Sequence, residues 1–210
     1  AGTFSDGKLN TGVNNPRISW ILERFVEFGA RENILYDAKP HVGTDVLLHV
    51  VQNLRKRILE LGGDVRFHTQ VTGIRTENGK VTGVEIGTGE IIDCDRVIFA
   101  VGHSARDTFE MLLESGVPME PKPFAMGVRI EHPQKLINKA QYGSDDLPLP
   151  AADYKLVCHL EDTTVYTFCM CPGGYVVAAA SEEGRLVTNG MSYADRDGEN
   201  ANAALLVALN

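Results

Sequence analysis

The first residues that could do chemistry form a glycine-containing loop at the start of the sequence. Gly2, Gly7 and Lys8 match the spacing G-x-x-x-x-G-K of the Walker A loop, which binds nucleotide phosphates. That loop continues with Ser or Thr, whose hydroxyl binds Mg²⁺, but Leu9 stands here. A helix expected from Pro16 starts too late to offer its N-terminus to a phosphate. The pattern disfavours a nucleotide hydrolase and leaves a small-residue loop whose amides could approach an anion.

Two later segments also place glycines where a ligand could approach the backbone. Gly87 and Gly89 begin a G-x-G pattern, but they lie between two expected hairpin strands with no helix after them, so we expect a structural turn. The apolar run 96–100 instead ends on small residues, with Val101 and Gly102 before an expected helix. This segment is either a tight strand-to-helix turn or a backbone edge that packs against a flat or anionic group.

Cys169 and Cys171 are two residues apart on an expected strand, so we expect both side chains on one face. Metal binding needs two further ligands, and the six histidines are scattered without metal-ligand spacing. Redox dithiols usually have two residues between the cysteines, and neighbouring same-face positions suit a relaxed disulfide poorly. We therefore predict buried, inert thiols, neither metal-bound nor disulfide-linked. No G-x-S-x-G elbow or acid/base carboxylate pair occurs, so no catalytic acid or base is assigned.

Helices and strands that must position these residues follow from the apolar periodicity. Helical spacing predicts one helix from Pro16 to Gly29, and a second that Thr44 caps and that Gly62 and Gly63 end. The period then changes to two, and the turn signal Asn78-Gly79 predicts a hairpin. The predicted elements of this middle region are strands at 65–67, 70–76, 81–86, 91–92 and 96–100, the last of them short and buried, and a helix capped by Ser104 and closed by Gly116.

Pro118, Pro121 and Pro123 mark a boundary, beyond which the chain is mostly strands. We expect strands at 124–130, 154–160, 165–170, 175–180 and 187–191, with a loop over 135–150. The apolar segment 202–210 lacks a capping signal and is interpreted as a helix that is cut at its end. Together with the absence of an initiator Met, this suggests an interior piece of a longer protein.

Composition excludes several classes of function. The 210 residues are 43% hydrophobic, and 20 basic against 28 acidic residues give a net charge of −8. An acidic domain without a long basic run is a poor candidate for nucleic acid, and no apolar run is long enough to span a membrane. Four cysteines without a signal peptide favour reduced thiols and a cytoplasmic location.

Several long strings resemble one family of proteins, and the match covers essentially the whole chain. They are GTFSDGKLNTG (2–12), YDAKPHVGTDVL (36–47), VIFAVGHSARDTFEML (97–112), FCMCPGGYVVAAASEEG (168–184) and TNGMSYADRDGENANAALLV (188–207). They resemble the FAD-dependent, or NAD/FAD-utilising, dehydrogenases of the glutathione-reductase-like flavoproteins.

This resemblance implies an α+β fold cut from an α/β parent, in which a β-rich substrate domain is inserted into a partial FAD-binding domain with a β-meander. The implied segments are an FAD-side loop and helix (1–40), the partial FAD-binding domain (41–120), the β-rich substrate domain (121–195) and the start of the return to the FAD domain (196–210). The family's G-x-G-x-x-G loop and ribose-binding acid would precede Ala1, and its closing segment would follow Asn210. The parent's own N- and C-terminal segments would therefore be partners of this chain.

The resemblance also implies which residues contact FAD. Val71 would place its backbone against the adenine, and the strand end at 100–102 would pass the adenosine–pyrophosphate part. The opening loop would lie on the flavin side. The implied cofactor-binding residues are Thr3, Phe4, Ser5, Asp6, Gly7, Lys8, Val71, Ala100, Val101 and Gly102, and Arg129, His41 and Asn189 are further polar candidates.

The sequence therefore predicts an FAD-dependent oxidoreductase as the parent, acting on a small-molecule substrate, with NAD(P)H as a candidate electron donor. The isolated piece is expected to be inactive and to lack bound FAD. The rival interpretations are a P-loop-like nucleotide hydrolase and a non-catalytic β-rich binding module.

Overall fold

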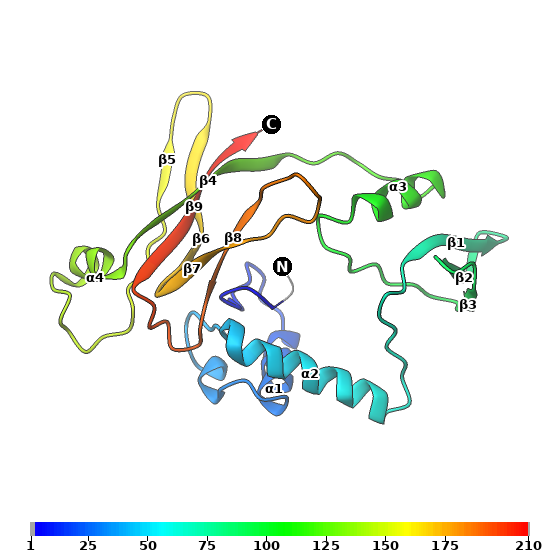
Figure 1. Ribbon diagram of the computed structural model, residues 1–210, viewed down its shortest axis with the longest axis horizontal. Helices are drawn as coiled ribbons and strands as arrows, with labels where there is room; N and C mark the ends of the chain where they lie inside the picture. The colour runs from blue at the N-terminus through cyan, green and yellow to red at the C-terminus, as the bar shows by residue number, and fades with distance from the viewer. Residues whose placement is uncertain (1–2, 210) are drawn as a thin grey trace. The chain divides into compact units, whose positions relative to one another are not determined.

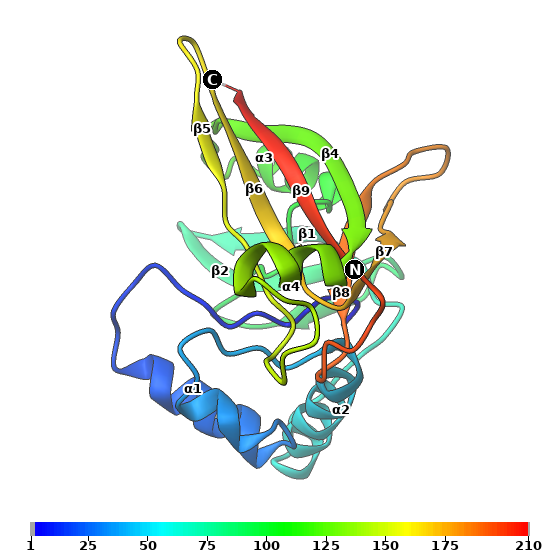
Figure 2. The ribbon, with the colours of Figure 1, turned by 90° about the vertical axis from the view of Figure 1, so that its left-hand side faces the viewer.

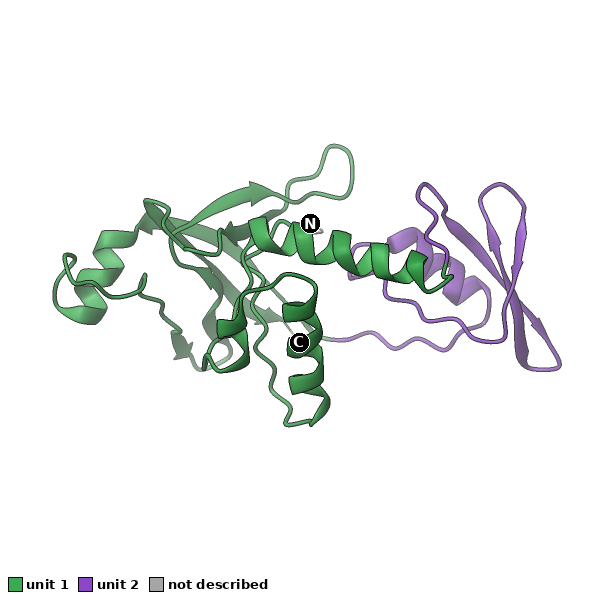
Figure 3. Cartoon of the chain, turned by 90° about the horizontal axis from the view of Figure 1, so that it is seen from below, with its two compact units in different colours: residues 1–63, 123–210 green, residues 64–122 purple. Residues whose placement is uncertain are grey.

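A computed structural model describes residues 3–209, so Gly2 of the loop motif lies outside the described residues. The chain forms two compact units, one of residues 1–63 with 123–210 and one of residues 64–122 (Figure 3). Both helices and sheets are present, which confirms the predicted α+β class. The helix over 44–60 belongs to the first of these units. The functional segments expected from the sequence divide the chain at other positions and stay predictions.

Three helices of the first unit enclose one apolar cluster. They are α1 (Arg17–Glu27), the short 3₁₀ helix η1 (Glu32–Leu35) and α2 (Thr44–Glu60). The buried residues of the cluster are Ala30, Ile34, Val42 and Val50, against which Leu22, Phe25 and Leu54 pack. Both long helices were predicted from this apolar spacing, and none of the helices in the described part of the chain is long and apolar enough to cross a membrane.

Glycines set both ends of α2. Gly62, with φ 83°, follows its last turn, and the amides of Gly62 and Gly63 donate to the carbonyls of Leu59 and Ile58. This confirms the predicted glycine termination. The predicted N-cap is wrong by one residue, because Gly43, not Thr44, occupies that position. The Thr44 hydroxyl instead donates 2.6 Å to the carbonyl of Thr3.

An antiparallel sheet in the order β4-β9-β6-β5 forms the rest of the first unit (Figure 1). Its strands are β4 (Phe124–Pro133), β5 (Val157–His159), β6 (Thr164–Cys171) and β9 (Asn200–Leu209), and a separate hairpin joins β7 (Gly174–Ala178) to β8 (Thr188–Ser192). Helix α4 (Gln134–Tyr142) packs against β4 and β9 (Figure 2). Its Ile137 is buried with Met170 and with Ala201 and Ala203, whose small side chains leave room for the helix.

Two predictions for this unit are wrong. The interval 135–150 contains α4 rather than only a loop. Residues 200–209 form strand β9 and not a cut helix. The Ala/Leu-rich composition favours a helix locally, but β9 pairs with β4 on one side and β6 on the other, and this tertiary pairing overrides local propensity.

The second unit contains the predicted meander. Strands β1 (Val71–Glu77), β2 (Lys80–Ile86) and β3 (Ile91–Asp93) pair antiparallel in chain order, followed by α3 (Arg106–Glu114). Asn78 and Gly79 both have positive φ, 51° and 77°, as a type I′ turn requires, so the hairpin prediction is confirmed. Gly87 and Gly89 form the structural turn between β2 and β3, as expected.

The predicted strands at 65–67 and 96–100 do not form within the described chain, and Ser104 does not cap α3, whose N-cap is Ala105. The segment 96–100 is also not buried, because Ile98 is 92% exposed. A strand buried in a parallel sheet needs hydrogen-bonding neighbours, and β1, β2 and β3 pair only among themselves. Residues 96–100 thus have the sequence of a buried strand but no strand to pair with in the second unit.

Gly127 in the middle of β4 tests how tightly the sheet is paired. A Cβ added there would overlap the carbonyl oxygen of Leu205 and lie 2.8 Å from its carbonyl carbon on β9. We expect Gly127→Ala to lower the free energy of unfolding by about 1–3 kcal/mol, because the strands must move apart. Denaturant unfolding measures this change. Gly12→Ala, where the new Cβ has open space, is the control, and equal effects of the two changes would contradict the close pairing.

Candidate functional site

The opening loop docks onto the start of α2 through its backbone. The amide of Val42 donates to the backbone carbonyl of Gly7 (3.0 Å), and the amide of Gly43 donates to the backbone carbonyl of Asp6 (3.1 Å). A short bridge pairs Lys8 with His41. These backbone bonds join residues 6–8 to residues 41–43, so the two segments form one structural element.

Asp6 is the centre of this site and is 1% exposed. Arg196 donates to its carboxylate from Nε (3.1 Å) and Nη2 (2.5 Å), and Ser192 donates through its hydroxyl. The Lys8 ammonium lies 3.1 Å away. Burial works to raise the pKa of Asp6, but the hydrogen bond from Arg196 and the charges of Lys8 and Arg196 outweigh it, so the pKa lies below its ordinary value. Asp6 is thus a buried, fully paired carboxylate.

The turn after β8 is fixed to the same place. The amide of Ala194 donates to the Asp45 carboxylate (2.9 Å), and its carbonyl lies 3.0 Å from Nε2 of His41. Because a carbonyl only accepts, Nε2 carries the proton. Burial, and next the charge of Arg196, lower the pKa of His41, so the ring is neutral at pH 7.

Lys8 extends the site to the sheet. Besides Asp6, its ammonium donates to the carbonyl of Met170 (2.5 Å) and lies 3.9 Å from Sγ of Cys171. On the neighbouring strands, Nη1 of Arg129 donates to Asn202 Oδ1 (2.7 Å) and to the Cys169 carbonyl (3.4 Å). Residues from 3–8, β4, β6 and β9 therefore converge on one region.

The two cysteines differ from the sequence-based expectation. A bulge interrupts β6 between Phe168 and Cys171, and Cys169 has a left-handed φ of 49°. The regular alternation on which the same-face prediction rests is therefore interrupted at this point. Cys171 is fully buried, whereas Cys169 is only partly buried.

The thiols also differ electrostatically. A hydrogen bond from Cys171, with the nearby charges of Lys8 and Arg129, lowers the pKa of Cys169 to about 6. The same hydrogen bond, and burial, raise the pKa of Cys171. The pair is thus a partly accessible thiol with a lowered pKa beside a buried thiol with a raised pKa, and the predicted burial holds for Cys171 but not for Cys169.

The first unit brings together most of the expected site residues. The polar candidate Asn189 donates from Nδ2 to the carbonyl of Phe4 in the loop (3.3 Å). The polar candidate His41 binds the carbonyl of Ala194 in the turn after β8. Arg129 reaches the region through Cys169. The expected residues Val71, Ala100, Val101 and Gly102 lie in the second unit. There Val71 pairs with Ile86 in the meander, and residues 100–102 are exposed.

Sequence reasoning missed Ser192 and Arg196, which bind Asp6 of the loop, and Asn202, which binds Arg129. The only available signal was Asp6 itself, since an Asp enclosed by small residues near a lysine needs a second cation if it becomes buried. Nothing local identifies that cation among the other basic residues, because Arg196 is 190 positions away.

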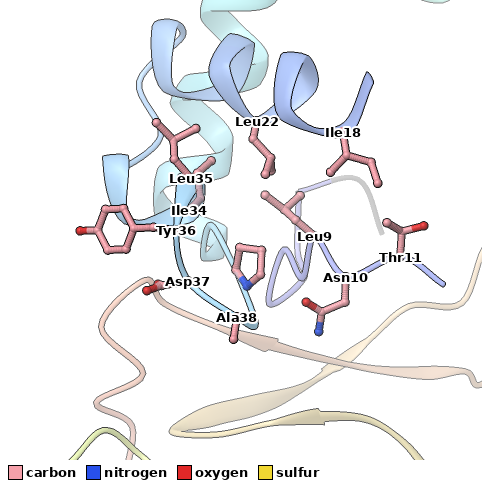
Figure 4. Close-up of a pocket in the computed structure, with 11 residues that line it drawn as sticks. Leu9, Asn10, Thr11, Ile18, Leu22, Ile34, Leu35, Tyr36, Asp37 and Ala38 are labelled. Carbon is pink, nitrogen blue, oxygen red and sulfur yellow. The ribbon is translucent and has the colours of Figure 1, made fainter. Parts of the chain in front are cut away.

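A hollow of about 370 Å³ opens beside the continuation of the loop (Figure 4). Leu9, Ile18, Leu22 and Ile34 form its apolar lining, and Asp37, which accepts from Asn33 (2.6 Å), lies at its edge. The lining contains no basic residue and no cysteine, so the hollow can accommodate an apolar group beside a polar edge.

Comparison with known proteins bears on this geometry. Residues 123–210 match the family model described as FAD-dependent protein, C-terminal domain-like. That match supports an FAD-dependent flavoprotein family. The matched region contains β4 to β9, and with them every residue that pairs the opening loop to the sheet.

A relative matches the whole chain. An uncharacterized protein of Clostridium beijerinckii is 51% identical over 214 residues, an alignment that covers 100% of this chain and 40% of the relative. The chain therefore spans 40% of the length of this relative.

Asp6→Asn tests the central ion pair. The change leaves Arg196 and Lys8 close together without a counter-charge, and we expect a loss of about 3–5 kcal/mol in the free energy of unfolding. Because the pKa of Asp6 is lowered in the folded state, its stabilisation is present above the unfolded pKa and is lost as pH falls below about 4. Denaturant unfolding between about pH 3 and 7 measures both effects.

Asp195→Asn in the same turn is the matched control. Asp195 pairs with Arg31 at the surface, where both side chains are more than half exposed, so we expect little change. A similar loss in the two variants, or an unchanged acid transition in Asp6→Asn, would show that Asp6 is not the stabilising carboxylate.

Proposed function

We propose that this chain is part of an FAD-dependent oxidoreductase of the glutathione-reductase-like type, which passes a hydride through its flavin. The family match over 123–210 carries this proposal, and the resemblance of strings in the rest of the chain supports it. FAD, when bound, supplies the hydride transfer, and the protein supplies position and electrostatics. The proposed substrate is a small molecule, the proposed electron donor is NAD(P)H, and the proposed location is the cytoplasm.

For the second unit, we propose contacts with the adenosine half of FAD. Residues 100–102 are exposed, Gly102 has a φ of 75°, and a Cβ added there would meet open space. A backbone edge of this kind fits a flat or extended group. Val71 would offer its backbone in the same way from the start of β1.

For the first unit, we propose that the loop Thr3–Lys8 lies on the flavin side. Lys8 is held by Asp6 and by the carbonyl of Met170, which fixes the position of its positive charge. Neutral His41 orients the Ala194 carbonyl instead of presenting a charge. Asp6 balances one of the two cations Lys8 and Arg196, so these residues would keep a net positive charge in place where a reduced flavin develops negative charge.

The N-terminus of α2 does not offer a site for the pyrophosphate. Such a site uses free amides and the positive dipole at a helix N-terminus. At α2 this place is occupied by the chain itself, because Asp45 brings a carboxylate and Gly43 donates to Asp6. We therefore propose that the pyrophosphate is bound by a loop elsewhere in the full-length protein.

The rival nucleotide hydrolase is less well supported. Its loop would present amides and a lysine to phosphate, but Gly7 N donates to Ser5 Oγ (3.1 Å) and Lys8 is bound to Asp6. No helix begins directly after Lys8, since α1 starts at Arg17. A non-catalytic binding module remains the rival outcome of the test below.

The full-length protein should be purified with FAD. We expect an absorption band at about 450 nm that is bleached by NADH or NADPH, because hydride transfer reduces the flavin. Release of FAD by denaturation, followed by chromatography, identifies the cofactor. A protein without flavin would contradict the proposal, and a retained flavin that no nicotinamide reduces would exclude this electron donor.

The isolated 210-residue piece should bind FAD only weakly. Each charge-assisted hydrogen bond to the pyrophosphate contributes about 1.5–3 kcal/mol, and losing several weakens binding by orders of magnitude. Titration of the piece with FAD, followed by flavin fluorescence, tests this against the full-length protein as control. Submicromolar binding to the piece would mean that it contains a complete cofactor site.

A further inference from the structure

The cysteine pair on β6 has no role in the proposed hydride transfer. Cys169 lies in the bulge of β6 between Phe168 and Cys171, and the Cys171 thiol donates to the Cys169 carbonyl at 3.3 Å. The thiol of one cysteine thus contacts the backbone of the other. Because Cys169 has a left-handed φ of 49°, regular strand alternation does not set the directions of these two side chains.

Charged groups from the opening loop and from β4 lie near the pair. Lys8 from the opening loop lies 3.9 Å from Cys171 Sγ, and Arg129 from β4 donates to the Cys169 carbonyl. Among the described residues, Asp6 is the one acidic group whose charge raises the pKa of both thiols, and it is already paired with Lys8 and Arg196. The net effect on Cys169 is that of two cations, which favour its thiolate.

Access differs between the two sulfurs. Cys169 is partly exposed, so a small reagent can reach it, whereas Cys171 is 0% exposed and packs where a Cβ on Gly190 would lie 2.8 Å from its Sγ. An accessible thiolate beside a protected thiol is the arrangement of oxidation-sensitive cysteine pairs.

We propose that Cys169 and Cys171 form a reversible redox pair, in which a small hydroperoxide oxidises Cys169 and Cys171 then closes a disulfide. The Cys169 thiolate attacks one peroxide oxygen, the O–O bond breaks, and an alkoxide or hydroxide leaves and is protonated. Cys169 is now a sulfenic acid. Cys171 loses its proton, its sulfur attacks Cys169 Sγ, and hydroxide leaves as water. In sum, two thiols and one hydroperoxide give a disulfide, an alcohol or water, and one water.

Alkylation of the intact protein provides the first test and needs no variant. Iodoacetamide is added at a series of pH values, and peptide mass spectrometry measures the rate at each cysteine. We expect the rate at Cys169 to reach half its maximum near pH 6, because the thiolate is the reactive form. Exposed Cys158 is the reference in the same molecule. A Cys169 rate that still rises above pH 8, or that stays below the Cys158 rate at pH 7, would overturn the proposal.

Hydrogen peroxide provides the second test. In the intact protein we expect the peptide with both cysteines to lose two hydrogen atoms and to regain them with dithiothreitol. In Cys171→Ser the reaction should stop at a sulfenic acid on Cys169, which dimedone traps. Cys158→Ser is the matched control and should behave like the unchanged protein. Oxidation of the unchanged protein without the disulfide, or a disulfide that joins Cys169 to Cys94 or Cys158, would contradict the pairing.

This inference does not depend on the flavin. If the full-length protein contains no FAD and the disulfide still forms, the oxidoreductase proposal fails alone. If FAD is present but peroxide leaves the pair unchanged, only the redox pair fails.

Discussion

A single buried carboxylate holds the first unit together. Asp6 is almost fully enclosed, so its charge must be balanced within the protein, and Arg196, Lys8 and Ser192 do so. Its partners come from opposite ends of the chain. The path of the opening loop, the turn after β8 and the start of α2 are all constrained by the need to bring these groups to one carboxylate.

Lys8 transmits that constraint to the sheet. It is bound to Asp6 on one side and to the Met170 carbonyl on the other, so its ammonium cannot move without leaving one acceptor unpaired. Met170 precedes Cys171, whose Sγ lies 3.9 Å from this fixed cation. The glycine loop matches the spacing of a phosphate-binding loop. In the structure, however, its lysine binds within the protein, to Asp6 and to the sheet.

What the sequence could predict depended on whether the signal was local. The turn at Asn78-Gly79 and the end of α2 at Gly62 follow from positive φ angles that few other residues adopt, and both were predicted. Strand β9 was mistaken for a helix because its Ala-rich composition says nothing about the two strands that pair with it. The segment 96–100 gives the opposite error, since it has the composition of a buried strand but no paired neighbour in the second unit.

Site residues follow the same rule. Lys8 and His41 could be singled out from the strings around them, but the buried pairing of Asp6 with Arg196 joins residues that no pattern relates. The bulge at Cys169 could not be predicted either, because the sequence of a bulged strand differs from that of a regular strand only in its register with the partner strand.

The distance along the chain between Asp6 and Arg196 has a consequence for synthesis. These residues are 190 positions apart, and ribosomes add about 5–20 residues per second, so roughly 10–40 seconds pass between them. During that time the opening loop cannot dock, because burying its carboxylate without the arginine is unfavourable. Helices α1 and α2 can form early, whereas the loop must wait in solvent until the last turn before β9 has left the ribosome. Docking of the first residues is therefore among the last events in the folding of this unit.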